Sequence, residues 1–274
     1  MRLSYSADQL RRFDRDRYLT VLFAPAGRRE ALFALYAFNL EVARTREAVR
    51  TPDMGLIRLQ WWCDAIAELY AGRCRQHPVL EALAPLPPLL TRGLLERLLE
   101  ARERDLAPEP FATLAELEAY AADTAGGLLE LALELLGGAD DAGRSAARRL
   151  GSAWALLGLL RATPMHARDG RVMLPTELLR AQGIESNALA DARGSPEMAA
   201  VVATVAARAA AELAAARTLA PKLSAAALPA LLLGPLADVL LRRLQACGHD
   251  PWRLPPRLGF APLRLAYANW RGRF

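Results

Sequence analysis

The sequence predicts an all-α protein, and three observations support this fold class. Alanine, leucine, arginine and glutamate dominate the chain, and all four are strong helix formers. The alternation of apolar and polar residues that marks a half-buried strand is absent, and β-branched residues are few. Capping residues, prolines and glycines recur at the spacing expected of helix ends. Apolar residues make up 53% of 274 residues, which is enough for a large core.

The expected helices follow one another with short connections. Ser6 is expected to cap the first helix, and Pro25 opens a second one that runs to about Arg50. The middle of this second helix, residues 31–40, is apolar on every side and is therefore predicted to be buried. Further helices are expected at about 53–72 capped by Asp53, 91–106 capped by Thr91, 113–137, 141–164, 175–182, 195–220, after Pro221, and 262–271.

Particular residues set the ends of the central helices. Thr113 and Glu116 form a capping box at one start, and two glycines end that helix after residue 136. Asp141 begins a helix that is expected to stop or bend at Pro164, because proline removes a backbone donor. Residues 166–175 are then expected to form a loop. Since the proline-rich spots look like turns rather than linkers, residues 1–274 are predicted to form one helical domain.

Charge and cysteine content exclude some classes of protein. The net charge is +5, and Lys222 is the only lysine among 35 basic residues. No run of basic residues exceeds two, which argues against a nucleic-acid partner. Three scattered cysteines argue against a disulfide framework and favour a reducing compartment. Cys74, His77, Cys247 and His249 do not have the spacing of a structural zinc site.

No segment is typical of a signal peptide or of a membrane span. The N-terminus has no apolar run, and its arginines alternate with aspartates that a transit peptide would avoid. The longest apolar stretch, residues 225–241, is interrupted by Pro229 and Pro235 and carries Asp238, so it is short for a span. It is expected to pack inside the domain, with contact to a membrane surface or a partner as the alternative.

Two segments carry a resemblance to a known family. Residues 36–47 (YAFNLEVARTRE) and 150–175 (LGSAWALLGLLRATPMHARDGRVMLP) resemble the two signature regions of the squalene/phytoene synthase family. Shorter pieces of the same family pattern lie between them in order, namely RLQWW at 58–62, HPVLEAL at 77–83, ERDL at 103–106 and residues 120–126. The resemblance implies a helical isoprenoid-synthase fold around a central cavity.

In that family, carboxylates four residues apart on facing helices hold Mg²⁺, which neutralises the departing diphosphate. The first pair of motif positions falls here on Ala43 and Glu47, with Arg44 beside them. The second pair falls on Ala162 and His166. Because alanine offers no ligand and the nearby arginines repel cations, we expect that Mg²⁺ binding is lost and that no other cofactor is used.

The anion-binding side of the pattern is partly retained. The residues expected to bind an anion or another ligand are Tyr36, Arg44, Arg46, Gln60, Arg161, Arg168 and Arg171. Arginine binds phosphate through two parallel donors, so such a pocket can hold a phosphate without metal. The alternative is that these arginines pair with Glu41, Glu47 and Asp169 and fill the former site. His166 as a catalytic base is disfavoured, since no nucleophile accompanies it.

The segment LRATPMHARDGRVMLP also resembles one branch of the family, which assists the assembly of mitochondrial respiratory complex I and has bacterial relatives. This implies an accessory role without synthase activity and, as partners, complex I subunits or assembly factors. The location implied is the cytoplasmic face of a bacterial inner membrane or the mitochondrial matrix side. Two alternatives stay open: a prenyl-diphosphate transferase with unusual site residues, and a metal-free binder of a lipid or isoprenoid phosphate.

Overall fold

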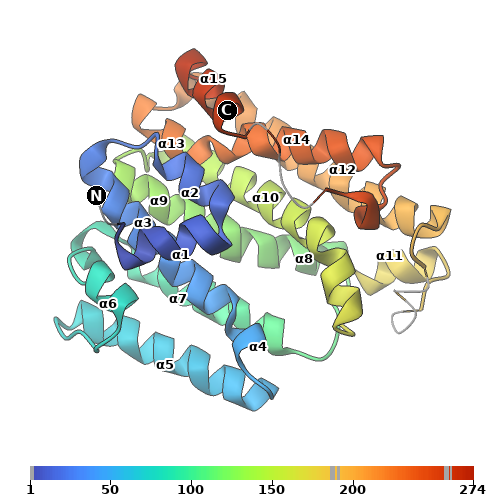
Figure 1. Ribbon diagram of the computed structural model, residues 1–274, viewed down its shortest axis with the longest axis horizontal. Helices are drawn as coiled ribbons and strands as arrows, with labels where there is room; N and C mark the ends of the chain where they lie inside the picture. The colour runs from blue at the N-terminus through green and yellow to red at the C-terminus, as the bar shows by residue number, and fades with distance from the viewer. Residues whose placement is uncertain (1–2, 186–188, 190–191, 256–258, 260) are drawn as a thin grey trace.

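The computed structural model describes residues 3–185, 189, 192–255, 259 and 261–274. Over these residues the chain forms α-helices joined by short turns, with no strand (Figure 1). The predicted all-α fold class is therefore confirmed.

The first half of the chain contributes seven helices within the described residues. Their bounds are α1 Tyr5–Phe13, α2 Arg15–Val21, α3 Ala26–Ala43, α4 Thr45–Ala48, α5 Pro52–Tyr70, α6 Pro78–Leu83 and α7 Arg92–Glu103. In the second half they are α8 Leu114–Ala121, α9 Gly127–Leu136, α10 Asp141–Arg168, α11 Thr176–Ala181, α12 Pro196–Thr218, α13 Leu228–Leu231, α14 Leu233–Ala246 and α15 Ala261–Arg271. A 3-10 turn, η2 (Arg104–Leu106), follows α7, and a π turn, η3 (Ala122–Gly126), joins α8 to α9.

The long helix α10 lies in the middle of the fold (Figure 1). It packs against α8, η3 and α9, and also against α12 and α14. Helix α3 packs against α1, α6 and α9, while α5 packs on α7 at the lower edge of Figure 1. The buried apolar side chains of these helices form one continuous cluster. The middle of α3 lies within it, as its apolar sequence predicted, and Phe38 meets Trp62 edge-to-face with ring centroids 5.4 Å apart.

Glycine permits the close contact between α10 and the π turn. A Cβ atom on Gly151 would overlap the carbonyl group of Ala125 and would lie 2.6 Å from the Cα atom of Gly126. Real Cβ atoms do not approach backbone so closely. The small residue therefore lets α10 touch the backbone of η3 directly.

Several expected helix starts are correct and two are displaced. Thr113 accepts the backbone N–H of Glu116 at 3.2 Å, as expected for a capping box. The first helix, however, is capped by Ser4, which accepts from Ala7 at 3.2 Å, whereas Ser6 lies buried inside the helix. Helix α5 is capped by Thr51 rather than Asp53, since Pro52 takes the first helical position. In both cases a better-placed hydroxyl lies two residues earlier.

Three further differences concern where helices end, where an additional one forms, and where one continues. The helix expected to start at Pro25 ends at Ala43, and Arg44 separates it from α4. The segment HPVLEAL forms helix α6, which His77 caps by accepting the Val79 N–H at 3.2 Å. Helix α10 continues through Pro164 to Arg168. Proline removes one helical hydrogen bond, but the turn after it is closed by bonds such as Asp169 N–H to the Met165 carbonyl at 3.1 Å.

Two stretches, Pro196–Lys222 and Ala225–Ala246, are long and apolar enough to cross a membrane by length and composition alone. This is weak evidence, because buried core helices have the same character. The first contains α12 and the second α13 and α14, and α12, α13 and α14 all pack against α10. Leu231, Leu232 and Leu233 are fully buried, so packing inside the fold accounts for this apolar segment, as the sequence predicted.

Candidate functional site

A network of polar side chains lies among the ends of α3, α7, α8 and α10. We call it the polar centre; its members are Asn39, Arg102, Asp105, Tyr120, His166 and Arg171. Five elements and the loop after α10 supply them, so the network forms only when these elements have packed together. Its residues lie beside the chain segments that resemble the family's metal-binding motifs.

Hydrogen bonds connect the first four members. The Tyr120 hydroxyl donates to Asp105 Oδ1 at 2.8 Å. The Arg102 guanidinium donates to Asp105 Oδ2 at 3.2 Å, to the Tyr120 oxygen at 2.8 Å and to Asn39 Oδ1 at 3.4 Å. Both oxygens of the Asp105 carboxylate are therefore engaged, and its side chain is only 11% exposed. Charge-assisted bonds of this kind are the strong ones in proteins.

The environment fixes the protonation states in this network. Burial raises the pKa of Tyr120 well above its ordinary value, and the carboxylate of Asp105 raises it further, so the phenol stays neutral. Burial opposes the charge on Arg102, but Tyr120 and Asp105 outweigh it and the pKa of the guanidinium is raised. The result is a buried guanidinium–carboxylate pair with a neutral phenol bridging it.

His166 stands at the edge of the polar centre on the last turns of α10. Its side chain is buried, and its Nδ1 atom has no hydrogen-bond partner in the described part of the chain. Burial, and then the positive charge of Arg171, lower its pKa to about 4, so the imidazole is neutral near pH 7. Arg171 itself donates to the backbone carbonyl of Asp105 at 3.1 Å, which attaches the loop after α10 to η2.

The first motif segment holds paired charges. Ala43 ends α3, and Arg44 then bonds Glu47 at 3.5 Å while its guanidinium lies 4.5 Å from the centre of the Phe13 ring. Glu41 is bound by Arg58 at 2.9 Å. Of the pairings that the sequence raised as the alternative, Arg44 with Glu47 is present here, whereas Glu41 is held by Arg58, which was not among the arginines expected to pair.

The other expected ligand residues are placed apart from one another. Arg161 bonds Asp16 of α2 at 3.3 Å, and the exposed Arg168 bonds the neighbouring Asp169 at 3.6 Å. Tyr36 is fully buried beneath the guanidinium of Arg17, with burial raising the pKa of its hydroxyl. Gln60 is exposed on α5 and donates to Asp64 at 2.8 Å. Ala162 is half-buried on α10.

Two of the expected arginines do share a cavity. Arg46 and Arg171 line a hollow of about 240 Å³ together with Arg104, and we call it the arginine cavity. Arg104 donates to the carbonyls of Glu109 and Pro110 at 2.8 and 2.7 Å. Arg46 forms no ion pair with any residue that the structure describes. Two carboxylates, Glu109 and Asp169, also line the cavity. Its three arginines outnumber them, and Arg46 is the one among these arginines without an ion pair or a carbonyl partner in the described residues, so the cavity keeps a small excess of positive charge for an anion.

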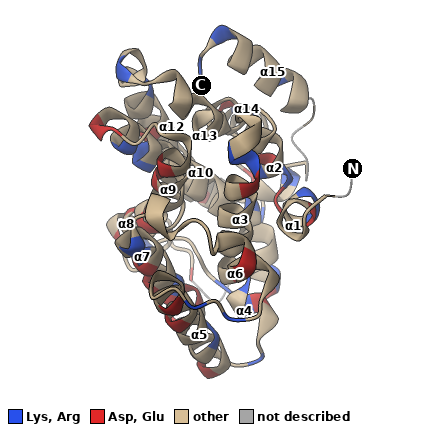
Figure 2. Cartoon of the chain, turned by 90° about the vertical axis from the view of Figure 1, so that its left-hand side faces the viewer, with Lys and Arg blue, Asp and Glu red and all other residues tan. Residues whose placement is uncertain are grey.

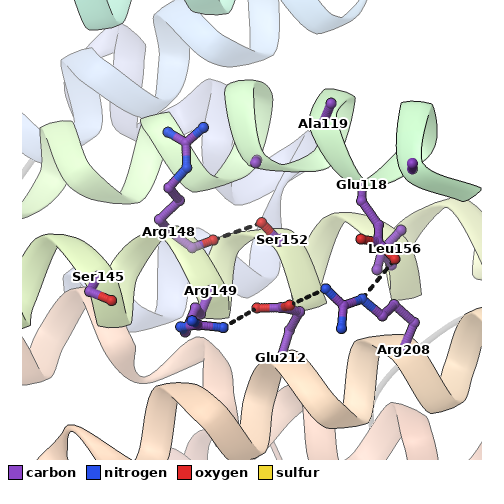
Figure 3. Close-up of a pocket in the computed structure, with 11 residues that line it drawn as sticks. Glu118, Ala119, Ser145, Arg148, Arg149, Ser152, Leu156, Arg208 and Glu212 are labelled. Atoms are coloured by element: carbon purple, nitrogen blue, oxygen red, sulfur yellow. Dashed lines mark hydrogen bonds and ion pairs between the residues drawn. The ribbon is translucent and has the colours of Figure 1, made fainter.

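The largest of the described cavities, about 410 Å³, lies between α8, α10 and α12 (Figure 3). Its charged walls bond one another: Glu212 accepts from Arg149 at 3.2 Å and from Arg208 at 2.7 Å, and Arg208 also reaches Glu118 at 2.7 Å. Arg148 is bound by Asp123 and Glu130. The ion pairs of Glu118, Arg149, Arg208 and Glu212 connect α8, α10 and α12. Because every charged side chain on the wall has a partner, the cavity has no unpaired cation for a ligand.

A model of squalene/phytoene synthases matches residues 10–265, which is most of the chain. The chain belongs to the squalene/phytoene synthase family. It is 31% identical over 274 residues to NADH dehydrogenase (ubiquinone) complex I, assembly factor 6 from Bos taurus, covering 98% of this chain and 82% of that protein. It is 30% identical over 174 residues to presqualene diphosphate synthase from Rhodopseudomonas palustris, covering 61% and 60%.

A crystal structure of a dehydrosqualene synthase in complex with ligand has the same fold. It superposes with a TM-score of 0.81 at 18% identity, and the match covers 98% of this chain and 94% of that chain. The resemblance implied an isoprenoid-synthase fold, and this comparison confirms it.

In this family member the residues at the motif positions do not fit a magnesium cluster. Ala43 and Ala162 have no ligating atoms, and the Glu47 carboxylate is engaged by Arg44 at 3.5 Å. His166 contributes a buried nitrogen, whereas Mg²⁺ prefers oxygen in octahedral geometry. Within the described residues, no three acidic, histidine or cysteine side chains gather as a metal site would require.

The polar centre is the feature that inspection of motifs missed. Arg102, Asp105 and Tyr120 lie within or beside two segments that resemble the family, ERDL and residues 120–126. Their order along the chain gave no sign that they bond to one another, because partners such as Arg102 and Asn39 are 63 residues apart. Arg102 lies four residues after the buried Leu98 and so continues the apolar face of α7, and a charged residue at such a position is the signal that could have indicated the network.

Proposed function

We propose that this protein is an accessory factor in the assembly of respiratory complex I and that it does not catalyse prenyl transfer. The observation that carries the proposal is the combination found at one site: alanines at two motif positions, in a chain that is 31% identical over nearly its whole length to a complex I assembly factor. The family relationship gives the fold, and the residues of the site argue against the family's chemistry.

The physical argument concerns charge. Ionisation of a prenyl diphosphate places several negative charges on the leaving group, and bound metal ions stabilise them in the transition state. Of the four motif side chains, only Glu47 is a carboxylate, and it forms an exposed ion pair with Arg44 at 3.5 Å. Other carboxylates nearby also have arginine partners: Asp105 is held by Arg102 and Tyr120, and Glu41 by Arg58. We infer that the site is a structural remnant in which arginine pairs replace metal.

We propose that the protein acts at a membrane face, on the cytoplasmic side in a bacterium or the matrix side in a mitochondrion, through contacts to complex I subunits, to other assembly factors or to lipid. What supports this is the similarity to assembly factor 6 together with the exposed apolar side chains Leu263, Tyr267 and Trp270 on α15.

The test is deletion of the gene in its own host. We expect assembled complex I, measured on native gels and as NADH:ubiquinone oxidoreductase activity, to fall severalfold, with succinate dehydrogenase as the unaffected control. Complementation with the Tyr120→Phe variant should restore complex I, since an assembly role does not need the phenol as a reactive group. Normal complex I levels in the deletion strain would refute the proposal.

A second experiment distinguishes an accessory factor without prenyl transfer from a prenyl-diphosphate transferase. The purified protein is incubated with farnesyl or geranylgeranyl diphosphate and Mg²⁺, and diphosphate release is followed. We expect no turnover above the background without protein. Turnover that Arg161→Ala abolishes would establish a transferase and contradict the inferred loss of chemistry.

One observation favours a second candidate function, the metal-free binding of a lipid or isoprenoid phosphate. The arginine cavity has Arg46 without an ion pair and Arg104 and Arg171 fixed by backbone carbonyls. Calorimetry with geranylgeranyl phosphate in a chelating buffer tests it, with Arg46→Gln expected to weaken binding about tenfold. Arg73→Gln, an exposed arginine after α5, is the matched control. Absence of binding at millimolar ligand would remove this candidate.

A further inference from the structure

Helix α15 presents large apolar side chains to solvent. Leu263, Tyr267 and Trp270 are 69%, 63% and 76% exposed, and their spacing places them on one face of the helix. The opposite face, with Leu265 fully buried, packs against α14 and α2. A soluble surface helix normally turns such residues inward, so this outward row marks a contact surface. We call the three exposed residues the aromatic face.

The segment that carries the aromatic face is strongly basic. Residues 251–274 contain five arginines and no aspartate or glutamate. Figure 2 shows basic but no acidic residues on α15, whereas both signs are present on α5 and α7. Arg264, Arg271 and Arg273 are exposed and form no salt bridge with any residue that the structure describes. The segment therefore offers uncompensated positive charge beside its apolar side chains.

A cavity next to the aromatic face gathers these charges. It has a volume of about 290 Å³, and Tyr267, Arg242, Arg264, Arg271 and Arg273 are among the residues that line it. The acidic residue on its wall, Asp238, is bound by both terminal nitrogens of Arg217 at 3.0 and 2.7 Å and so does not offset the other arginines. The cavity is thus suited to an anionic group held alongside apolar material.

We propose that α15 docks this protein on a bilayer of anionic phospholipids. The aromatic face enters the boundary between headgroups and acyl chains, and the arginines of the adjacent cavity bind lipid phosphates. Tryptophan and tyrosine prefer this boundary, and basic residues flanking an apolar helix face are attracted to anionic lipid. An 11-residue helix is about 16 Å long, too short to cross a bilayer, so it lies in the plane of the membrane.

The charge around the aromatic face favours a membrane over a second copy of this chain as the partner that covers it. Two copies meeting through α15 would bring their arginine-rich cavities together without acids to neutralise them, which is unfavourable. An anionic bilayer supplies the complementary charge and the apolar layer at once. The inference deepens the proposed function by naming the surface that meets the membrane, and its test uses purified protein without complex I.

The experiment is cosedimentation with vesicles of phosphatidylcholine alone and of equal parts phosphatidylcholine and phosphatidylglycerol. We expect binding to the anionic vesicles that weakens when salt shortens the range of the charges, and little binding to the neutral ones. Arg264→Gln with Arg271→Gln should lower the partition coefficient about 20-fold. Tyr267→Ser with Trp270→Ser should lower it more than about tenfold.

Matched controls keep the test specific. Met54→Ser with Ile57→Ser removes side chains that are 51% and 71% exposed on α5, at the opposite edge of Figure 1 from α15. Arg50→Gln with Arg73→Gln lowers the net charge by the same amount on exposed residues outside the cavity. Both control proteins should bind anionic vesicles within about twofold of the unaltered protein. Circular dichroism checks that every variant is folded.

Three results would overturn the proposal: equal binding to neutral and anionic vesicles, unchanged binding by the aromatic or arginine variants, or a dimer in sedimentation analysis that the Tyr267 and Trp270 substitutions abolish. If the unaltered protein does not bind anionic vesicles but the deletion strain has a complex I defect, the docking surface is overturned and the assembly role stands. Normal complex I together with vesicle binding as expected would overturn the assembly role alone.

Discussion

Replacement of Asp105 by alanine tests the polar centre directly. The substitution leaves the Arg102 guanidinium, only 14% exposed, without its carboxylate, and it leaves the Tyr120 hydroxyl without its acceptor. Removing one partner of a buried ion pair destabilises a protein by about 3–5 kcal/mol, because the remaining charge stays desolvated. For a protein of this size that corresponds to a fall in Tm of roughly 6–20 °C.

The measurement is thermal and urea unfolding of the unaltered protein, Asp105→Ala, Tyr120→Phe and the double variant. Since Asp105 and Tyr120 share a hydrogen bond at 2.8 Å, their effects should be non-additive by about 0.5–3 kcal/mol. Asp64→Ala is the matched control, because that carboxylate is 51% exposed and should change stability by no more than about 0.5 kcal/mol. A loss below about 1 kcal/mol for Asp105→Ala would refute the view that this pair organises the site.

Three other expectations follow from the structure. Folding lowers the pKa of His166 from 6.5 to about 4, so its contribution of about 3 kcal/mol to the free energy of unfolding is present above pH 6.5 and is lost as the pH falls toward 4. In urea titrations, His166→Gln should lack this part of the pH dependence. Gly151→Ala should cost about 1–3 kcal/mol through overlap with the π turn, whereas Gly158→Ala, with open space around it on the same helix, should stabilise by about 0.5–1 kcal/mol in the same assay. Calorimetry with Mg²⁺ should give no saturable heat, and a stoichiometric site would contradict the misfit of the motif residues.

The parts of the fold that local patterns encode were predictable. Burial of α3 followed from apolar residues on every side, and the starts at Thr113 and Ser195 followed from their hydroxyls, which accept backbone N–H groups three residues later. The starts of α1 and α5 were wrong by two residues because another hydroxyl competed for the same role. The passage of α10 through Pro164 depended on packing along the whole helix, which no local rule contains.

The site was less accessible to prediction, for a physical reason. The departures at Ala43 and Ala162 are visible in the sequence because they are absences of a ligand. The partners of the arginines are not, since Arg161 meets Asp16 across 145 residues and Arg171 meets the Asp105 carbonyl across 66. Which acid neutralises which arginine is determined by tertiary packing, so the sequence could offer only the general alternative of pairing.

The π turn between α8 and α9 has a consequence for the relative rotation of these two helices. A π turn holds one residue more than an α-helical turn, and one residue corresponds to about 100° of rotation. With that residue in place, Tyr120 points to Asp105 while Glu130 points to Arg148 on α10. Deletion of a single residue between 122 and 126 would restore a regular helix but turn one of these two side chains away from its partner. The irregular turn therefore sets the rotation of α9 relative to α8, so that Tyr120 on α8 can bond Asp105 while Glu130 on α9 bonds Arg148.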